Sequence, residues 1–363
     1  MLATARSQIR ILARDPILLA LVAVIFVSIL IFVVYPLAMV LIASFQERGE
    51  WTTANYGLMA ERRLYRTALW NSLSVGALVG IVGVVIGYIA AFVLTRLDVP
   101  FKRTLHLLTM LPIISPPFVS AVSILFLFGF NGLITRQMLG LQDFNIYGFH
   151  GVVWSQIFTF APIAYLSLRG VLASISPVLE DAALNMGASR WQTFWKVTFP
   201  LSMPGIASAF LIVFIESMSD FGNPLVLAGA SFPMLAPQAY LEITGSFNLS
   251  RGATLAVLLL MPSLTAFAIQ RYYLSKRQYV TVTGKPGAST SKIVSPAMKW
   301  ALYSFVVLFA AIVVLFYSVI VVGAFTQVWG FNYTPSLDHF RYVFQVGFKT
   351  VIDTLIIAAI STP

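Results

Sequence analysis

Two carboxylates stand four residues apart at the end of an apolar stretch of the sequence. Glu216 and Asp220 follow the uncharged run Val197–Ile215, and Asn223 comes three residues later. Residues at i and i+4 share one face of a helix, so the two acids are predicted to lie together. Oxygen donors suit hard cations, and ionisable groups at membrane depth usually face a cavity or a partner. The alternative interpretation is that both acids are solvated at the mouth of the helix.

No other set of residues predicts catalysis. The chain has no cysteine, which excludes thiolate metal ligands and thiol nucleophiles. The histidines His106, His150 and His339 lie far apart and form no metal-binding motif, and no G-x-S-x-G sequence is present. Residues 283–285 match only the end of a phosphate-binding loop, since Tyr279 stands where its first glycine is required. We therefore expect no enzymatic activity and no bound cofactor or metal.

The composition predicts a membrane protein. The chain contains 59% hydrophobic and 10% charged residues, against about 45–50% and about 25% in typical soluble domains. Seven runs without charge are long enough, or nearly so, for a spanning helix of about 20 residues. They are Ile17–Gln46, Thr67–Thr95, Thr104–Thr135, Phe144–Leu168, Val197–Ile215, Gly252–Gln270 and Trp300–Leu337. We expect an all-α, polytopic transmembrane helical bundle.

Glycine and proline refine this assignment. Gly76, Gly80, Gly83 and Gly87 repeat along the second run, and small residues four apart let another helix approach closely. We expect this helix to lie inside the bundle, although an ordinary glycine-rich helix is the alternative. The uncharged segment Phe221–Leu241 contains several glycines and prolines, so we do not count it as a span.

The charge distribution predicts the topology. The formal net charge is +10, and the basic residues concentrate before the first run and after the second, fourth and sixth runs. This is the positive-inside pattern of a multi-pass membrane protein with a cytoplasmic N-terminus. The positive charge therefore indicates orientation in membrane lipid and gives no support for a nucleic-acid partner.

The sequence contains a partial internal repeat. Residues 276–297 have the Gly, Pro, Ser and Thr composition of a cytoplasmic linker. Beyond it a long apolar run ends at Ala324-Phe325, as the first ends at Ser44-Phe45, and a new apolar run follows. We expect a first repeat of six helices over 1–275 and the truncated start of a second repeat over 298–363.

The loop between the fourth and fifth runs predicts a helix–turn–helix over 176–200. Ser176 suits an N-cap and Pro177 the first helical position, while Gly187 suits the left-handed residue after the helix. Ser189 can cap a second short helix that bears aromatic residues. The expected structure exposes small and aromatic side chains to a partner in the cytosol.

The spacing in this loop resembles the EAA motif of permease subunits in binding-protein-dependent ABC importers. Asp181-Ala182-Ala183 is followed after three residues by Gly187, and after nine more by a segment ending at Pro200. Asp replaces the usual Glu, so either Glu180 or Asp181 could hold the acidic position. The resemblance implies the type I importer fold and assigns Glu180, Asp181, Ala182, Ala183, Gly187 and Pro200 to coupling with a cytosolic ATPase dimer, which binds ATP and Mg²⁺.

Two further segments narrow the resemblance. Residues 220–227 and 275–284 look like parts of the fused two-repeat permeases of ferric-iron type importers, a group that also includes permeases for phosphonates, thiamine and sugar phosphates. The resemblance implies a bacterial inner-membrane protein that receives a solute, with ferric iron favoured, from an extracytoplasmic binding protein. Glu216, Asp220 and Asn223 are then candidates for the translocation path. An ion-coupled secondary transporter and a passive channel are the rival classes.

Overall fold

The computed structural model describes residues 16–274 and 294–362. Within these ranges, eight helices are long and apolar enough to cross a membrane. They are Pro16–Ser44, Arg63–Arg96, Phe118–Met138, Phe149–Ser174, Arg190–Ser219, Leu249–Tyr272, Pro296–Ala324 and Asp338–Ser361. Apart from two short hairpins and the connecting loops, the described chain is helical, which confirms the predicted fold class. Residues 283–285 and most of the predicted linker lie outside the described residues.

The chain divides into two compact units, Met1–Arg66 with Gln238–Met261 and Thr67–Pro237 with Pro262–Pro363. The first contains α2 (Pro16–Ile29), the π-helical turn η1 (Leu30–Val34), α3 (Tyr35–Ser44), β1 (Gln46–Glu47), β2 (Glu50–Trp51) and α4 (Ala54–Glu61). Helices α5 (Arg63–Arg96), α13 (Leu235–Thr244) and α14 (Leu249–Ile269) contribute residues to both units. In the first unit Thr254 Oγ1 donates to the Ser44 carbonyl at 3.2 Å, which ties α14 to the end of α3.

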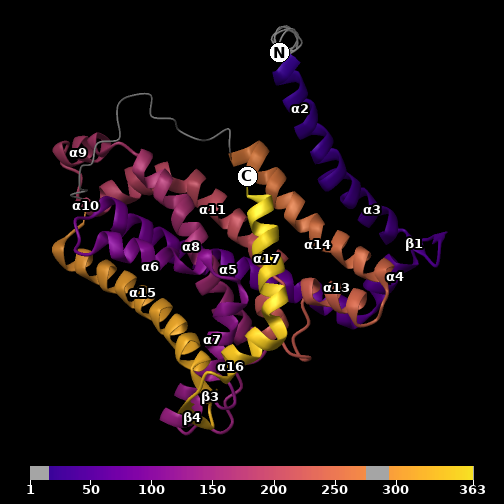
Figure 1. Cartoon of the computed structure of the whole chain (residues 1–363). Helices are drawn as coiled ribbons and strands as arrows, with labels where there is room; N and C mark the ends of the chain where they lie inside the picture. Colours follow the sequence, from indigo (N-terminus) through magenta and orange to yellow (C-terminus); the bar gives the residue numbers. More distant parts are fainter. Residues whose placement is uncertain (1–15, 275–293, 363) are drawn as a thin grey trace. The chain divides into compact units, whose positions relative to one another are not determined.

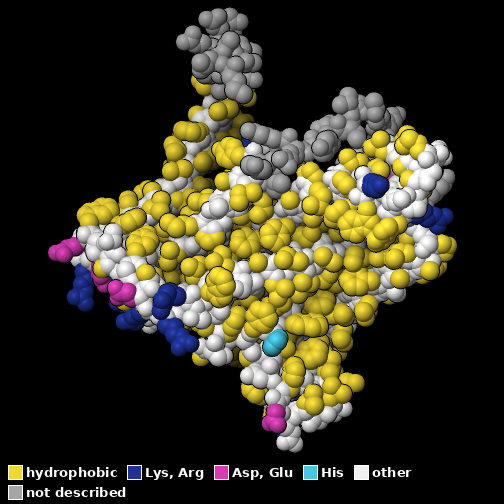
Figure 2. Space-filling model, turned by 180° about the vertical axis from the view of Figure 1, so that it is seen from behind, with side chains coloured by type: hydrophobic (Ala, Val, Ile, Leu, Met, Phe, Trp, Pro, Cys, Tyr) yellow, Lys and Arg dark blue, Asp and Glu magenta, His cyan; other side chains and the backbone are white. Residues whose placement is uncertain are grey.

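The second unit contains the larger hydrophobic core. Its helical elements are α6 (Lys102–Ile114), α7 (Phe118–Phe128), η2 (Leu133–Met138), α8 (Phe149–Ser174), α9 (Pro177–Asn185), α10 (Arg190–Thr193), η3 (Phe194–Thr198), α11 (Phe199–Ser219), α12 (Gly222–Leu227), η4 (Gln270–Leu274), α15 (Pro296–Ala324), α16 (Asp338–Tyr342), η6 (Val343–Gly347) and α17 (Phe348–Ser361). The strands β3 (Thr326–Val328) and β4 (Asn332–Pro335) form a hairpin. Figure 2 shows hydrophobic side chains over most of one face, with charged side chains in a few small groups.

The glycine-rich helix packs closely against two others, as its spacing predicts. A Cβ added at Gly87 would lie 2.7 Å from Ala164 Cβ in α8, and one at Gly80 would lie 2.8 Å from the Phe210 ring in α11. Gly76 and Gly83 also face these helices. Helices α8 and α11 therefore approach α5 at the positions where it lacks side chains.

Two predicted helices have different bounds in the structure. The third run, Thr104–Thr135, is broken at Ser115–Pro117 into α6 and α7, because a proline restricts the residue before it and cannot donate a backbone N–H. The fifth helix begins at Arg190 instead of Val197, so the predicted second short helix is its first turn. The π-helical turn η3 joins the two parts just before Pro200.

The two stretches that are similar in sequence, one after Ser44 and one after Ala324, share their local structure. α3 ends at Ser44 and α15 ends at Ala324, and an antiparallel hairpin follows each helix. The Phe45 carbonyl accepts from Thr52 N at 2.8 Å, and the Phe325 carbonyl accepts from Ser336 N at 2.8 Å. The same hydrogen bond thus closes both hairpins, so the two stretches share this local geometry.

Helix α15 runs beside α6 and α7 in the second unit (Figure 1). Ser123 Oγ of α7 donates to the Phe316 carbonyl at 2.9 Å, and Tyr317 OH donates to the Leu111 carbonyl at 3.2 Å. A Cβ at Gly323 would lie 2.4 Å from the Phe126 ring. Helix α15 therefore packs on α6 and α7.

Candidate functional site

The loop over 176–200 forms the predicted helix and turn. Ser176 is the N-cap of α9 and Pro177 is its first residue, although the Ser176 side chain makes no capping hydrogen bond. At the other end Gly187 has φ +89°, a conformation that glycine adopts without a steric penalty. Gly187 N donates to the Leu184 carbonyl at 3.0 Å and Ala188 N to the Ala183 carbonyl at 3.1 Å. These two bonds form a Schellman motif, which confirms Gly187 as the C′ residue.

A buried ion pair attaches α9 to the end of α5. Glu180 is 1% exposed, and its Oε1 accepts from Arg96 Nη2 and, at 2.8 Å, from Thr198 Oγ1. Arg96 Nη1 donates to the Ile175 carbonyl at 2.9 Å. Because a buried charge is costly without a partner, this arrangement holds α9, α5 and η3 together. The motif left open whether Glu180 or Asp181 holds its acidic position. Glu180 is the one whose side chain is buried.

The opposite side of α9 is exposed. Asp181 and Ala182 are exposed, while Ala183 is buried. Beyond them the Met186 side chain is 83% exposed. A short helix that presents small, apolar and acidic side chains on a rigid base has the character of a docking surface.

The first turn of the fifth helix is capped as the sequence predicts. Gln192 N donates to Ser189 Oγ at 3.2 Å, and Ser189 N donates to Gln192 Oε1 at 2.9 Å, which completes a capping box. Trp195 and Phe199 then pack with ring centroids 4.7 Å apart. The capped end fixes the direction in which the aromatic side chains of this turn leave the helix.

Glu216 and Asp220, which are predicted to share a helix face, have different surroundings in the structure. Helix α11 ends at Ser219, and Asp220 follows it with an extended backbone, φ −66° and ψ 121°. Glu216 is exposed, whereas Asp220 is 7% exposed. Asp220 is the residue at which the helix ends, so its side chain packs into the corner with the next segment, whereas Glu216 lies on the exposed side of the helix.

Asp220 lies in a buried polar cluster. Its Oδ2 accepts from Gln156 Nε2 at 2.8 Å and from Asn223 Nδ2 at 2.9 Å, and its Oδ1 accepts from Asn223 N at 3.3 Å. Ser217 Oγ donates to Gln156 Oε1, so the cluster joins α8 to the corner between α11 and α12. These contacts hold the corner in place. Within the described chain, no group of three His, Cys, Asp or Glu side chains could hold a metal ion.

Sequence reasoning missed three residues of these sites. In the sequence, Arg96 is one more basic residue at the predicted cytoplasmic end of a span. No feature of the sequence indicates that it forms an ion pair with Glu180. Thr198 and Gln156 lie within apolar runs as isolated polar residues. Such a residue is a signal, since buried polar groups are usually hydrogen-bonded, but it does not identify the partner.

Comparison with known proteins gives a consistent picture. The family model for the binding-protein-dependent transport system inner membrane component matches residues 83–279. The ferric transport system permease protein FbpB of Actinobacillus pleuropneumoniae is 33% identical over 98% of this chain and 53% of that protein. The chain therefore spans about half the length of that permease. The molybdenum transport system permease protein ModB of Mycobacterium tuberculosis is 32% identical over 46% of this chain and 62% of that protein.

Solved structures share the fold. A bacterial alginate ABC transporter, in complex with an alginate pentasaccharide-bound periplasmic protein, matches with a TM-score of 0.62 and 17% identity. The match covers 76% of this chain and 99% of that one. At this identity the likeness supports the architecture of a membrane permease and no particular solute.

Proposed function

The chain belongs to the family of binding-protein-dependent transport system inner membrane components, and we propose that it forms part of the permease of an ATP-driven importer. An extracytoplasmic binding protein delivers the solute, and a separate cytosolic ATPase dimer binds ATP and Mg²⁺. Closure of the ATPase drives alternating access through α9. The N-terminus is cytoplasmic, as the positive-inside pattern indicates.

The observation that carries this proposal is the two-sided character of α9. Its buried side holds Glu180 against Arg96 at the end of the long helix α5. Its exposed side offers Asp181, Ala182 and Met186. A force applied to the exposed side therefore reaches a membrane helix through a rigid, buried contact, as coupling requires.

A docking test separates this function from its rivals. Ala182→Trp in the full-length permease places a bulky side chain on the exposed side, so ATPase co-purification and ATP-driven uptake should both fall. Gln142→Trp, at an exposed loop position between α7 and α8 on the extracytoplasmic side of the proposed topology, is the control for docking and should co-purify with the ATPase as the wild type does. Uptake that persists without ATP and collapses with an ionophore would instead indicate an ion-coupled secondary transporter.

We further propose ferric iron as the solute. The proposal is supported by the ferric permease that aligns with 98% of this chain and by the exposed carboxylate of Glu216, since oxygen donors suit hard cations. A molybdenum permease also aligns, over a shorter stretch, so similarity alone does not identify the solute and uptake must be measured. Proteoliposomes of the whole transporter with its ATPase and binding protein should take up ferric iron. Preferential uptake of molybdate, a phosphonate, a sugar phosphate or thiamine would reassign the solute.

A further inference from the structure

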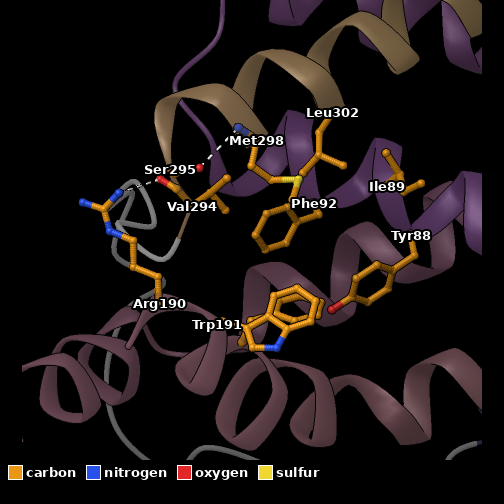
Figure 3. Close-up of a pocket in the computed structure, with 10 residues that line it drawn as sticks. Tyr88, Ile89, Phe92, Arg190, Trp191, Val294, Ser295, Met298 and Leu302 are labelled. Atoms are coloured by element: carbon orange, nitrogen blue, oxygen red, sulfur yellow. Dashed lines mark hydrogen bonds between the residues drawn. The ribbon is translucent and has the colours of Figure 1, made fainter. Parts of the chain in front are cut away.

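An apolar pocket lies between the first turn of the fifth helix and the start of α15. Its volume is about 400 Å³, within the ~300–1,000 Å³ range of pockets that hold small ligands. Figure 3 shows Phe92, Trp191, Met298 and Leu302 around the space, which α5, α10 and α15 enclose. All of these elements lie in the second compact unit in this region. The lining suits a hydrocarbon chain far better than a polar metabolite.

The pocket lies at the depth of a membrane interface. Tyr88 and Phe92 are eight and four residues before Arg96, the last residue of α5, which places them about 12 and about 6 Å from that end. Trp191 and Trp300 are exposed nearby, at 64% and 53% of their surfaces. Exposed tryptophans beside basic residues are typical of the boundary between hydrocarbon and water.

An arginine stands at the mouth of the pocket. Arg190 Nη1 donates to the Val294 carbonyl at 3.4 Å (Figure 3). The described residues give Arg190 no salt-bridge partner, and a guanidinium group has five N–H donors. It can therefore bind an anion through its remaining donors, and planar donors of this kind match phosphate oxygens.

We propose that the pocket binds an anionic phospholipid of the cytoplasmic leaflet, with an acyl chain among the apolar residues and the phosphate at Arg190. The apolar lining suits the acyl chain, the interfacial depth suits a lipid, and the Arg190 guanidinium group, which has no salt bridge among the described residues, suits the phosphate. The choice of leaflet rests on the proposed orientation of the transporter. The bound lipid joins α10, which follows the α9 docking surface, to α15, the first helix after the linker, so its presence steadies the coupling segment against α15.

Lipid binding to the full-length transporter with its ATPase tests the proposal. The transporter is stripped in mild detergent and offered phosphatidylglycerol or phosphatidylcholine with identical acyl chains, and bound lipids are counted by native mass spectrometry. The variants are Arg190→Gln, which removes the charge, and Leu302→Trp, which fills the pocket. Lys196→Gln is the matched control, because Lys196 is an exposed cation six residues further along the same helix and does not line the pocket.

The wild type should retain phosphatidylglycerol about fivefold better than phosphatidylcholine, as one basic residue at a membrane surface predicts. Arg190→Gln should abolish this preference, Leu302→Trp should reduce retention of both lipids, and Lys196→Gln should match the wild type. Equal retention of the two lipids by the wild type, or an unchanged preference in Arg190→Gln, would overturn the proposal. Displacement of the lipid by inorganic phosphate alone would also overturn it, because the site would then be an anion site without an acyl chain.

Two features of the experiment distinguish failure of the lipid proposal from failure of the proposed function. Arg190 is exposed, so Arg190→Gln remains informative if Leu302→Trp fails to assemble. Lipid retention is measured without ATP or solute, so a negative result leaves the proposed transport function untouched. Conversely, a transporter that binds the lipid but takes up no solute would refute only the proposed function.

Discussion

Arg96 and Glu180, which are 84 residues apart in the sequence, form a buried ion pair between the end of α5 and the first turn of α9. Both side chains are almost fully buried, at 4% and 2% exposure. The pair connects α9, whose exposed side is the proposed docking surface, to the long apolar helix α5. The coupling proposal therefore depends on this contact more than on any other.

Glu180→Ala should destabilise the transporter and uncouple it. The change leaves the Arg96 guanidinium buried without its carboxylate, which typically costs about 3–5 kcal/mol. Asp181→Ala removes an exposed neighbouring acid and should change stability by less than about 0.5 kcal/mol. Thermal unfolding and ATPase co-purification of the full-length protein measure both effects. Equal unfolding temperatures of the two variants would show that the buried pair adds no stability of its own.

The contribution of the two charges can be separated from that of side-chain packing. The double variant Arg96→Met/Glu180→Leu replaces both charges by apolar side chains, which is often neutral or stabilising in other proteins. We expect its unfolding temperature to exceed that of Glu180→Ala, because no charge is left unpaired. An unfolding temperature below that of the single variant would mean that packing, and not charge, dominates this contact.

Gly187→Leu should leave the protein inserted in the membrane but impair coupling. A Cβ at Gly187 meets no atom within 4 Å, so its φ of +89° is the only obstacle, and a left-handed conformation costs other residues about 1–2 kcal/mol. Gly170 in α8 also has open space around it but lies in an ordinary helix, which makes Gly170→Leu the matched control. Gly187→Asn should retain more uptake than Gly187→Leu, because Asn tolerates this conformation.

Membrane abundance, ATPase co-purification and uptake together check this prediction. Abundance should stay near normal in all three glycine variants, whereas co-purification and uptake should fall only in Gly187→Leu and, less strongly, in Gly187→Asn. Normal uptake by Gly187→Leu would remove the turn from the coupling mechanism.

Local features of the fold could be read from the sequence. The spacing of Ser176, Pro177 and Gly187 predicts α9, since capping preferences act between residues that are close in the chain. Contacts between residues that are distant in the chain could not be predicted from the sequence. Glu180 and Asp181 are equivalent acids in the sequence, and only the arrival of Arg96 from α5 makes one of them internal. The start of the fifth helix was also missed, because the π-helical turn η3 joins α10 to α11 and the helix therefore begins earlier than charge alone suggests.

Substitutions in the glycine-rich helix should differ according to what each glycine faces. A Cβ at Gly87 would lie 2.7 Å from the Tyr165 backbone nitrogen, and backbone atoms cannot move aside easily. A Cβ at Gly76 would lie 3.2 Å from the end of the Phe214 side chain, which can rotate. Gly87→Ala should therefore lower the unfolding temperature clearly, by the equivalent of about 1–3 kcal/mol, and Gly76→Ala much less. Similar unfolding temperatures for the two variants would contradict the close approach of α5 and α8.

Removal of the charge should affect uptake at Glu216 and stability at Asp220. Glu216 is exposed, so Glu216→Gln should leave the unfolding temperature unchanged and reduce ferric uptake if this carboxylate lies on the path. Asp220 accepts hydrogen bonds from Gln156 and Asn223 in a buried cluster. Asp220→Ala leaves these donors without an acceptor, which costs about 1–3 kcal/mol, and should lower stability. Uptake, binding-protein-stimulated ATPase activity and thermal unfolding of the full-length transporter distinguish the two roles. Wild-type uptake by Glu216→Gln would place that acid in solvent at the mouth of the helix, and an unaltered unfolding temperature in Asp220→Ala would show that the cluster does not stabilise the corner between α11 and α12.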